Sequence, residues 1–262
     1  MKVWFSKYEA LGNDFIIIDL RVPQGGENFS PYEFAKKYCE RRFGIGADGV
    51  ITLENPSSEE FDFKMRIINS DGSEAEMSGN GIRCLAKYVY DMNLISKDSV
   101  VFETKAGPRV VKKIQDNFEV DMGKPKIKDK FFLREGDNWG EKFECIEVDV
   151  GNPHVVIFGD YPREVFLSFA PQISKSKNVN VEFAKIEDKN VIKVWVWERG
   201  VGETLACGTG AVAVFASARE KKLIKNEAEI SFKGGKLKVK QKDENVFIEG
   251  GANFVFSGYV EI

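Results

Sequence analysis

Two glycine-rich turns carry the side chains best suited to chemistry in this sequence. The first is EAEMSGNGIRC at 74–84 and the second is GETLACGTGA at 202–211. The turns align with a constant offset of 129 positions (207 − 78), which places Ser78 opposite Cys207. Each turn precedes a run of small and apolar residues that is typical of a buried helix. One turn therefore presents a hydroxyl where the other presents a thiol.

The local physics of these turns favours anion binding. Glycines let consecutive backbone N–H groups converge, and the following helix adds its positive end, so each turn can hold a carboxylate or a phosphate. The same field favours thiolate over thiol, and the sequence therefore predicts a lowered pKa for Cys207. Such a thiol can attack as a nucleophile or transfer a proton.

Two kinds of enzyme could use this cysteine. The chain has one histidine, His154, and a Cys–His hydrolase built from Cys207 and His154 stays open, although it gives the duplicated turn no purpose. Two acid–base groups that act on opposite faces of one tetrahedral carbon do give it a purpose, and their chemistry is racemisation or epimerisation. A metal-dependent enzyme is the weakest alternative, because the histidine has no partner at ligand spacing.

Most of the chain reads as strand and turn. Short runs rich in Val, Ile, Phe and Trp are bounded by Gly, Asn, Asp or Pro, which predicts β-structure. Three helices are expected: one that opens at Ser30 with a capping box, one over about 80–91 that ends at Asn93, and one over 208–222.

The repeat predicts the domain organisation. Each glycine turn lies between a strand and a helix, and EVDMG at 119–123 is echoed by EVDVG at 147–151. We expect an α/β (α+β) fold with two pseudo-symmetric domains, each a strongly curved, mostly antiparallel sheet or barrel wrapped around a central helix. The expected N-terminal half is 1–122, with the C-terminal strand 252–262 returning to it. The C-terminal half is 123–251, the active site lies in the cleft between the halves, and a hinge lies near 121–125.

Composition narrows the class of partner. Among 262 residues, 38 Lys and Arg face 41 Asp and Glu, for a net charge of −3. This balance argues against nucleic-acid and membrane partners and favours a small molecule. The sequence shows neither a signal peptide nor a spanning segment, so a cytoplasmic protein is expected. Cys39, Cys84 and Cys145 are expected to be buried apolar residues.

The chain resembles the diaminopimelate epimerases over essentially its whole length. That family belongs to a wider group of cofactor-independent, two-domain amino-acid racemases, hydroxyproline epimerases and phenazine-biosynthesis-like isomerases. The motifs that carry the resemblance are GNDFIIID at 12–19, RRFGIGADGV at 41–50, INSDGSEAEMSGNGIRC at 68–84, GNPHVV at 151–156, NVNVEF at 178–183 and ERGVGETLACGTGA at 198–211.

The resemblance implies a role for each site residue. Cys207 is implied as one catalytic acid–base group, Ser78 occupies the position of the other, and His154 and Glu198 are implied to tune the thiol pKa. The remaining contacts are implied to be Asn13, Asn69, Asn152, Asn180, Glu198 and Arg199 for the distal amino-acid centre, and Gly79–Asn80 and Gly208–Thr209 for the reacting carboxylate. Asp48 and Glu203 are interpreted as structural turn residues.

The resemblance also implies the reaction and its participants. It implies interconversion of LL- and meso-diaminopimelate for lysine and peptidoglycan synthesis by transfer of the α-proton. The substrate is a diamino diacid, no metal or cofactor (in particular no pyridoxal phosphate) is required, and the protein is a homodimer. The alternatives are a broader amino-acid racemase, a hydroxyproline epimerase or dehydratase, and a ligand-binding protein that has lost turnover.

Position 78 departs from the family pattern, in which cysteine precedes the first GNG. The hydroxyl of Ser78 is a far weaker acid than a thiol with a pKa of ~8.5. Three explanations stay open: serine introduced in place of cysteine, a natural enzyme in which Cys207 works alone with protons arriving through water, or a change of reaction toward elimination.

Overall fold

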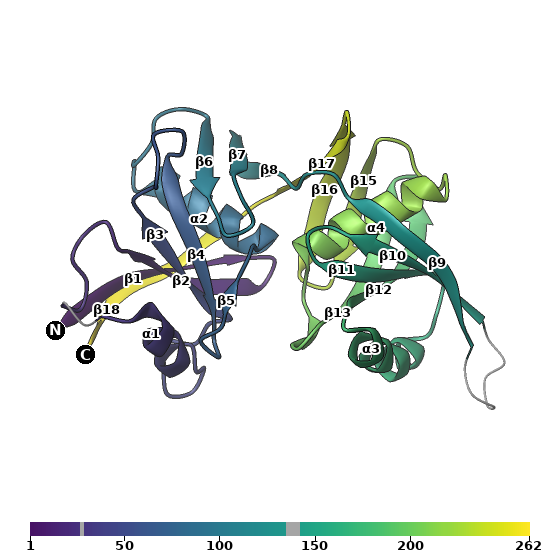
Figure 1. Ribbon diagram of the computed structural model, residues 1–262, viewed down its shortest axis with the longest axis horizontal. Coiled ribbons are helices and arrows are strands. Elements are labelled where there is room, and N and C mark those ends of the chain that lie inside the picture. The colour runs from purple at the N-terminus through teal and green to yellow at the C-terminus, as the bar shows by residue number, and fades with distance from the viewer. Residues whose placement is uncertain (27–28, 135–141) are drawn as a thin grey trace. The chain divides into compact units, whose positions relative to one another are not determined.

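The computed structural model describes residues 1–26, 29–134 and 142–262. Their contacts divide the chain into two compact units, Met1–Val120 with Gly250–Ile262 (unit 1) and Asp121–Glu249 (unit 2). Each unit combines a curved, mostly antiparallel sheet with helices (Figure 1). The predicted α/β fold class is confirmed.

Unit 1 holds a sheet built around two parallel pairings. Strands β18, β1 and β2 pair antiparallel, β2 pairs parallel with β3, β3 and β4 pair antiparallel, and β4 pairs parallel with β6. Its strands are β1 (Lys2–Ala10), β2 (Asn13–Asp19), β3 (Gly49–Glu54), β4 (Phe63–Asn69), β5 (Glu74–Ala75), β6 (Ser99–Glu103), β7 (Arg109–Ile114), β8 (Asn117–Asp121) and β18 (Asn253–Glu261). Its helices are α1 (Pro31–Tyr38) and α2 (Gly79–Asp91).

Unit 2 repeats this plan. Strands β9, β10 and β11 pair antiparallel, β11 pairs parallel with β12, β12 and β13 pair antiparallel, and β13 pairs parallel with β15. Its strands are β9 (Lys126–Arg134), β10 (Lys142–Asp149), β11 (Pro153–Phe158), β12 (Asn180–Asp188), β13 (Val191–Glu198), β14 (Gly202–Thr204), β15 (Glu227–Phe232), β16 (Gly235–Lys242) and β17 (Asn245–Gly250). Its helices are α3 (Arg163–Lys177) and α4 (Gly208–Glu220). The repeat seen in the glycine turns therefore extends to the sheet topology.

The three predicted helices are confirmed. Ser30 caps α1, and its hydroxyl accepts from the Glu33 N–H at 3.4 Å. Beyond α2, Asn93 takes the left-handed conformation expected of a stop residue, with φ of 52°. The third helix, α4, is buried along almost its whole length.

Sequence reasoning missed one helix, α3. Its N-cap residue, Pro162, makes no side-chain capping bond, and Pro171 lies inside the helix. Both features are signals against a helix. Packing overrides them: Phe166 and Ile173 join a core cluster with Val181 and Phe183 of β12.

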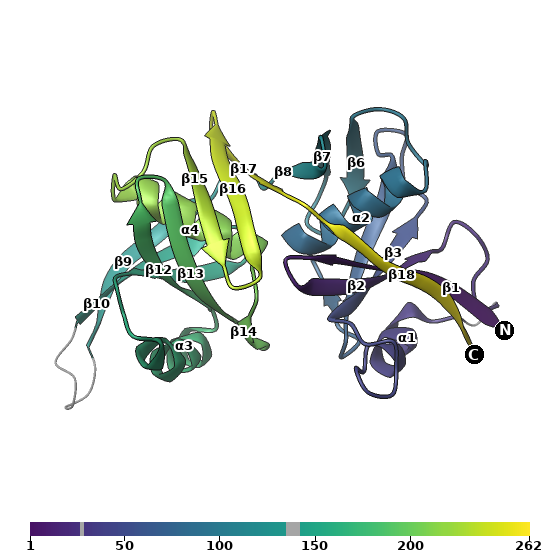
Figure 2. The ribbon, with the colours of Figure 1, turned by 180° about the vertical axis from the view of Figure 1, so that it is seen from behind.

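Strand β12 separates the two helices of unit 2. Successive side chains of a strand point to opposite faces, so Val181 and Phe183 face α3. Glu182 points the other way and reaches the first turn of α4 at Gly210. In Figure 2, α3 and α4 flank the strands of this unit. The face toward α4 is thus the one that carries ionisable groups.

The predicted burial of three cysteines is confirmed. Cys39, Cys84 and Cys145 are buried and free, and burial raises the pKa of each thiol. Among the described residues, no helix is long and apolar enough to cross a membrane.

Candidate active site

Ser78 and Cys207 occupy the same structural position in their units. Ser78 is the N-cap of α2, with φ of −139° and ψ of 123°, and its hydroxyl accepts from the Gly81 N–H at 3.0 Å. Cys207 is the N-cap of α4, with φ of −131° and ψ of 119°, and its sulfur accepts from the Gly210 N–H at 3.4 Å. The offset in the sequence therefore corresponds to one backbone geometry built twice.

Each cap leaves N–H groups for an anion. In α4 the sulfur of Cys207 accepts a hydrogen bond from the N–H of Gly210, and the Cys207 carbonyl accepts one from the N–H of Ala211 at 2.9 Å. The N–H groups of the first helical residues, Gly208 and Thr209, have no acceptor inside the helix. Together with the positive helix end they suit a carboxylate.

The lowered pKa predicted for Cys207 is wrong. Burial raises the pKa of this thiol well above its ordinary value, and the nearby carboxylates of Glu198 and Glu182 raise it further. Hydrogen bonds from Thr209 and from the Gly210 backbone act in the opposite direction but are smaller effects. With 6% of its surface exposed, Cys207 is a protonated thiol that can act as an acid.

Glu198 is placed to exchange a proton with Cys207. Its carboxylate is half-buried at the end of β13, and burial raises its pKa. It accepts hydrogen bonds from the Thr204 hydroxyl at 2.6 Å and from the Cys207 thiol. A carboxyl group with a raised pKa beside a thiol is a competent proton acceptor. The structure therefore brings together Cys207 and Glu198 as the resemblance implies.

His154 lies in a chain of polar contacts that reaches the same thiol. Its ring is fully buried, and Nε2 lies 3.0 Å from Oδ1 of Asn152. The Asn152 amide donates to the Thr209 hydroxyl at 3.3 Å, and that hydroxyl lies 3.3 Å from the Cys207 sulfur. With Glu198, five of the predicted site residues thus form one connected group within unit 2.

Glu182 was not among the predicted site residues. Its Oε1 lies 2.7 Å from Nδ1 of His154, and both side chains are fully buried. It stands two positions after Asn180 in the NVNVEF motif, so strand alternation places both on one face. The two-residue alternation of a strand is therefore the sequence signal from which Glu182 could have been predicted.

Two predicted residues of unit 1, Asn13 and Asn80, belong to a second connected group. The Asn80 amide donates to Oδ1 of Asn13 at 3.2 Å, and the Asn13 amide donates to Asp48 at 2.6 Å. Arg41 bridges Asp48 at 2.7 Å and Asp14 at 2.8 Å. Asp48, interpreted from sequence as a structural turn residue, therefore also orients Asn13.

Arg83 supports the first turn from within the protein and was also missed. Its guanidinium is fully buried and donates to the Gly79 carbonyl at 2.9 Å and to Oδ1 of Asn80 at 3.0 Å. Burial lowers its pKa to about 10, so the group stays charged at neutral pH. An arginine among the small and apolar residues of a predicted helix was the available signal.

The other predicted contacts lie near strand ends. Asn180 donates to the Pro153 carbonyl at 3.1 Å and accepts from the Arg199 backbone N–H at 2.9 Å, which fixes the end of β13. The Arg199 side chain is exposed. Asn69 is exposed and donates to the Ser73 hydroxyl at 2.9 Å, a turn contact that joins it to neither connected group.

Glu203, the other residue interpreted as structural, pairs with Arg163 at 2.8 Å. The contact ties the strand before the second glycine turn to the start of α3.

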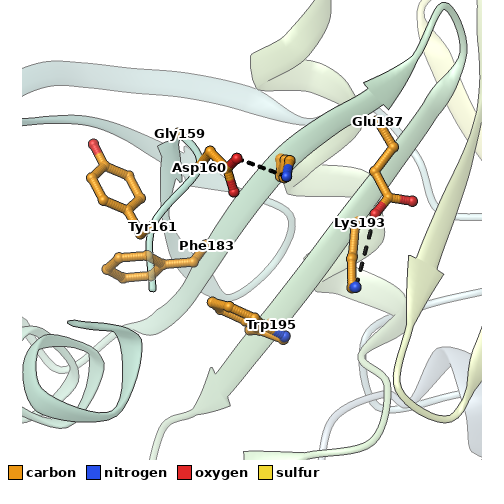
Figure 3. A pocket seen from close by; sticks show the side chains of 8 residues that line it. Gly159, Asp160, Tyr161, Phe183, Glu187, Lys193 and Trp195 are labelled. Carbon is orange, nitrogen blue, oxygen red and sulfur yellow. Dashed lines mark ion pairs between the residues drawn. The ribbon is translucent and has the colours of Figure 1, made fainter. Parts of the chain in front are cut away.

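A surface pocket of about 430 Å³ lies in unit 2, away from these residues (Figure 3). Tyr161, Phe183 and Trp195 line it, together with Lys185 and Lys193. The two lysines are paired with Asp160 and Glu187. The pocket contains neither a candidate nucleophile nor a member of the two connected groups.

The contact between Gly210 and Glu182 makes a prediction about stability. A Cβ at position 210 would lie 2.7 Å from Glu182 Oε1, which His154 holds in place. We expect Gly210→Ala to lower the free energy of unfolding by about 1–3 kcal/mol through overpacking, although alanine is the better helix former. Thermal unfolding measures it. Gly258→Ala is the control, because its Cβ meets nothing closer than 3.5 Å. An unchanged melting temperature for Gly210→Ala would contradict the proposed rigidity.

Comparisons with known proteins agree with this geometry. The family model for diaminopimelate epimerase matches residues 5–128 and 146–255. The diaminopimelate epimerase of Carboxydothermus hydrogenoformans is 42% identical, covering 97% of this chain and 98% of that protein. The diaminopimelate epimerase of Methanococcus maripaludis is 38% identical, covering 98% and 99%.

Solved structures share the fold at low identity. A hydroxyproline epimerase from Agrobacterium vitis has a TM-score of 0.76 at 13% identity, covering 99% of this chain and 92% of its own. A phenazine biosynthesis protein of the PhzF family from Bacillus anthracis has a TM-score of 0.75 at 19% identity, covering 100% of both chains.

The family match and the curated relatives place this chain in the class of epimerases, and the solved structures share its fold. Within that class, this chain belongs to the diaminopimelate epimerase family.

Proposed function

We propose that the chain epimerises diaminopimelate, interconverting the LL and meso forms by transfer of the α-proton in lysine and peptidoglycan synthesis. Neither a metal nor a cofactor takes part. The observation that supports the proposal best is the pair of equivalent helix caps, Ser78 and Cys207, inside a family of epimerases. Two such groups suit a reaction in which protons are exchanged at both faces of one carbon.

The reacting end of the substrate needs an anion site and an acid–base group. The N–H groups at the start of α4 stabilise the charge that develops on the carboxylate as the α-proton leaves. In one direction the group at position 78 takes the α-proton from one face, and Cys207, which holds its proton at rest, delivers that proton to the other face. In the reverse direction Cys207 takes the α-proton after passing its own to Glu198, with which it shares a hydrogen bond. The mechanism requires Ser78 and Cys207 to reach one α-carbon from opposite sides.

The distal end of the substrate carries a second carboxylate and amine. We propose that Arg199 binds this carboxylate, since a guanidinium makes two parallel hydrogen bonds to it. Asn180 supports Arg199 through the backbone contact at 2.9 Å. Asn13, Asn69 and Asn152 supply amide groups for the same centre. The two chemically similar ends of one diamino diacid would thus be bound by different groups of the protein.

Arg199→Met is expected to weaken diaminopimelate turnover. Loss of a hydrogen-bonded charge costs about 1.5–3 kcal/mol, which corresponds to roughly a ten- to hundredfold fall in kcat/KM. The assay measures deuterium incorporation at the α-carbon in D₂O, and inversion by chiral chromatography. Arg109→Met, a partly buried arginine on β7, is the matched control. A diaminopimelate preference that survives Arg199→Met would contradict the distal assignment.

The same assay separates the alternatives. Turnover of lysine or hydroxyproline in place of diaminopimelate would indicate a broader racemase or a hydroxyproline epimerase, and a dehydrated product would indicate elimination. Tight binding of diaminopimelate without isotope exchange, even after Ser78→Cys, would indicate a binding protein.

We further propose a cytoplasmic homodimer. Support comes from apolar side chains that stay exposed on β1 and β18, namely Trp4, Phe254, Val255, Phe256 and Tyr259. Rows of this kind are typical of surfaces that a partner covers. Sedimentation of the purified protein tests the state of assembly.

A further inference from the structure

Glu182 is a buried carboxylate whose surroundings do not explain its presence by stability alone. It is fully buried on β12. Its Oε1 contacts His154, and its Oε2 has no hydrogen-bond partner in the described part of the chain. Burying a carboxylate with an unsatisfied oxygen costs free energy that an apolar residue would avoid. Its position thus calls for an explanation beyond packing.

The position of Glu182 connects it to the reacting thiol. An ionised carboxylate only accepts hydrogen bonds, so Nδ1 of His154 is the donor at 2.7 Å. That bond sets the orientation of the ring, in which Nε2 lies 3.0 Å from the side-chain oxygen Oδ1 of Asn152. From Asn152 the chain continues through Thr209, whose hydroxyl lies 3.3 Å from the sulfur of Cys207.

A second, direct link runs through the start of α4. Glu182 Oε1 lies 2.7 Å from the position that a Cβ on Gly210 would take, and the N–H of Gly210 donates to the sulfur of Cys207. The negative charge is therefore held next to the helix end that carries the thiol, and it raises the pKa of Cys207. The helix dipole in turn stabilises the carboxylate.

We propose that Glu182 is a positioning residue that acts on Cys207. It orients His154, and through this ring the amide and hydroxyl beside the sulfur, and its charge keeps the proton on the thiol. The part of the proposal that concerns turnover rests on the proposed epimerisation. The part that concerns the protonation of the thiol does not.

The ionisable groups around Cys207 come from three strands: Glu198 on β13, Glu182 on β12 and His154 on β11. Of these three groups, Glu182 is the one that contacts His154 and also reaches the first turn of α4 at Gly210. Removing its charge while keeping its shape therefore isolates its contribution.

The test is Glu182→Gln with two measurements. First, alkylation of Cys207 by iodoacetamide is followed against pH by mass spectrometry, which separates this cysteine from the other three. Since the carboxylate disfavours the thiolate, its loss lowers the thiol pKa, and the profile should move toward lower pH by roughly one pH unit or more. Second, kcat for deuterium exchange should fall about tenfold or more, with KM little changed, because the residue does not touch the substrate.

Two further variants show whether Glu182 acts through His154. In His154→Gln/Glu182→Gln, kcat should be no lower than in the poorer single variant, since both changes break one chain. Glu182→Asp keeps the charge but shortens the reach, so kcat should fall while the alkylation profile stays in place; this variant also carries the test if Glu182→Gln fails to fold. Glu187→Gln, an exposed position on the same strand, is the matched control.

The outcomes separate this proposal from the proposed function. An alkylation profile that Glu182→Gln leaves unmoved would overturn the role of the charge, whatever the substrate. Additive losses of kcat in the double variant would overturn the route through His154. If no variant exchanges the α-proton of diaminopimelate but the alkylation profile moves as expected, the charge effect stands and the proposed reaction fails.

Discussion

Ser78→Cys is expected to raise the rate of epimerisation by about 10²–10⁴-fold, the range that a well-placed acid–base group contributes. The structure favours a direct exchange, because the caps at 78 and 207 share their backbone conformation and their bond to the third helical N–H. A thiol at 78 would therefore occupy the position that mirrors Cys207, with a far more acidic proton than a hydroxyl offers.

Deuterium incorporation and inversion at the α-carbon measure this gain. Ser78→Ala, which removes any acid at the position, is the reference. If the serine and cysteine forms exchange and invert equally fast, two-sided proton transfer is the wrong mechanism for this chain, and Cys207 works with solvent on the other side.

Cys207→Ser is expected to lower the exchange rate by about 10²–10⁴-fold. Serine is the informative replacement because Ser78 already demonstrates that a serine caps the equivalent helix, accepting from Gly81 at 3.0 Å. Alanine would also remove the cap, at a cost of about 1 kcal/mol in stability. A loss of rate in Cys207→Ser with an unchanged melting temperature therefore reports on chemistry alone.

Cys145→Ser controls for the general effect of replacing a buried thiol, since Cys145 lies in the core cluster beside α3. An exchange rate that Cys207→Ser leaves intact would remove Cys207 from the reaction and direct attention to Glu198.

Local features of the fold and site were predictable from sequence. The glycine turns, the cap at Ser30 and the stop at Asn93 depend on residues within a few positions of each other. Because the turn occurs twice, the sequence also indicated that the two halves of the chain share one plan. Helix α3 could not be predicted, since its proline content argues against it, whereas its packing against distant strands such as β12 stabilises it.

The electrostatics of the site depended on contacts between distant residues. His154 and Glu182 meet because β11 pairs parallel with β12 in a register that sets His154 opposite Asn180 and Val156 opposite Glu182. No sequence pattern predicts the register of this strand pair. The direction of the Cys207 pKa shift also depended on the folded surroundings: the helix end favours the thiolate, but burial and the carboxylates of Glu198 and Glu182 outweigh this effect.

The return of β18 to β1 also affects the order in which the protein can be assembled during synthesis. Unit 2 is encoded by one uninterrupted stretch, Asp121–Glu249, whereas unit 1 takes its β18 strand from the residues that follow that stretch. Because a ribosome delivers residues in sequence order, the edge of β1 waits for its partner until the other half has already emerged. The half that is translated first is therefore the half whose sheet is completed last.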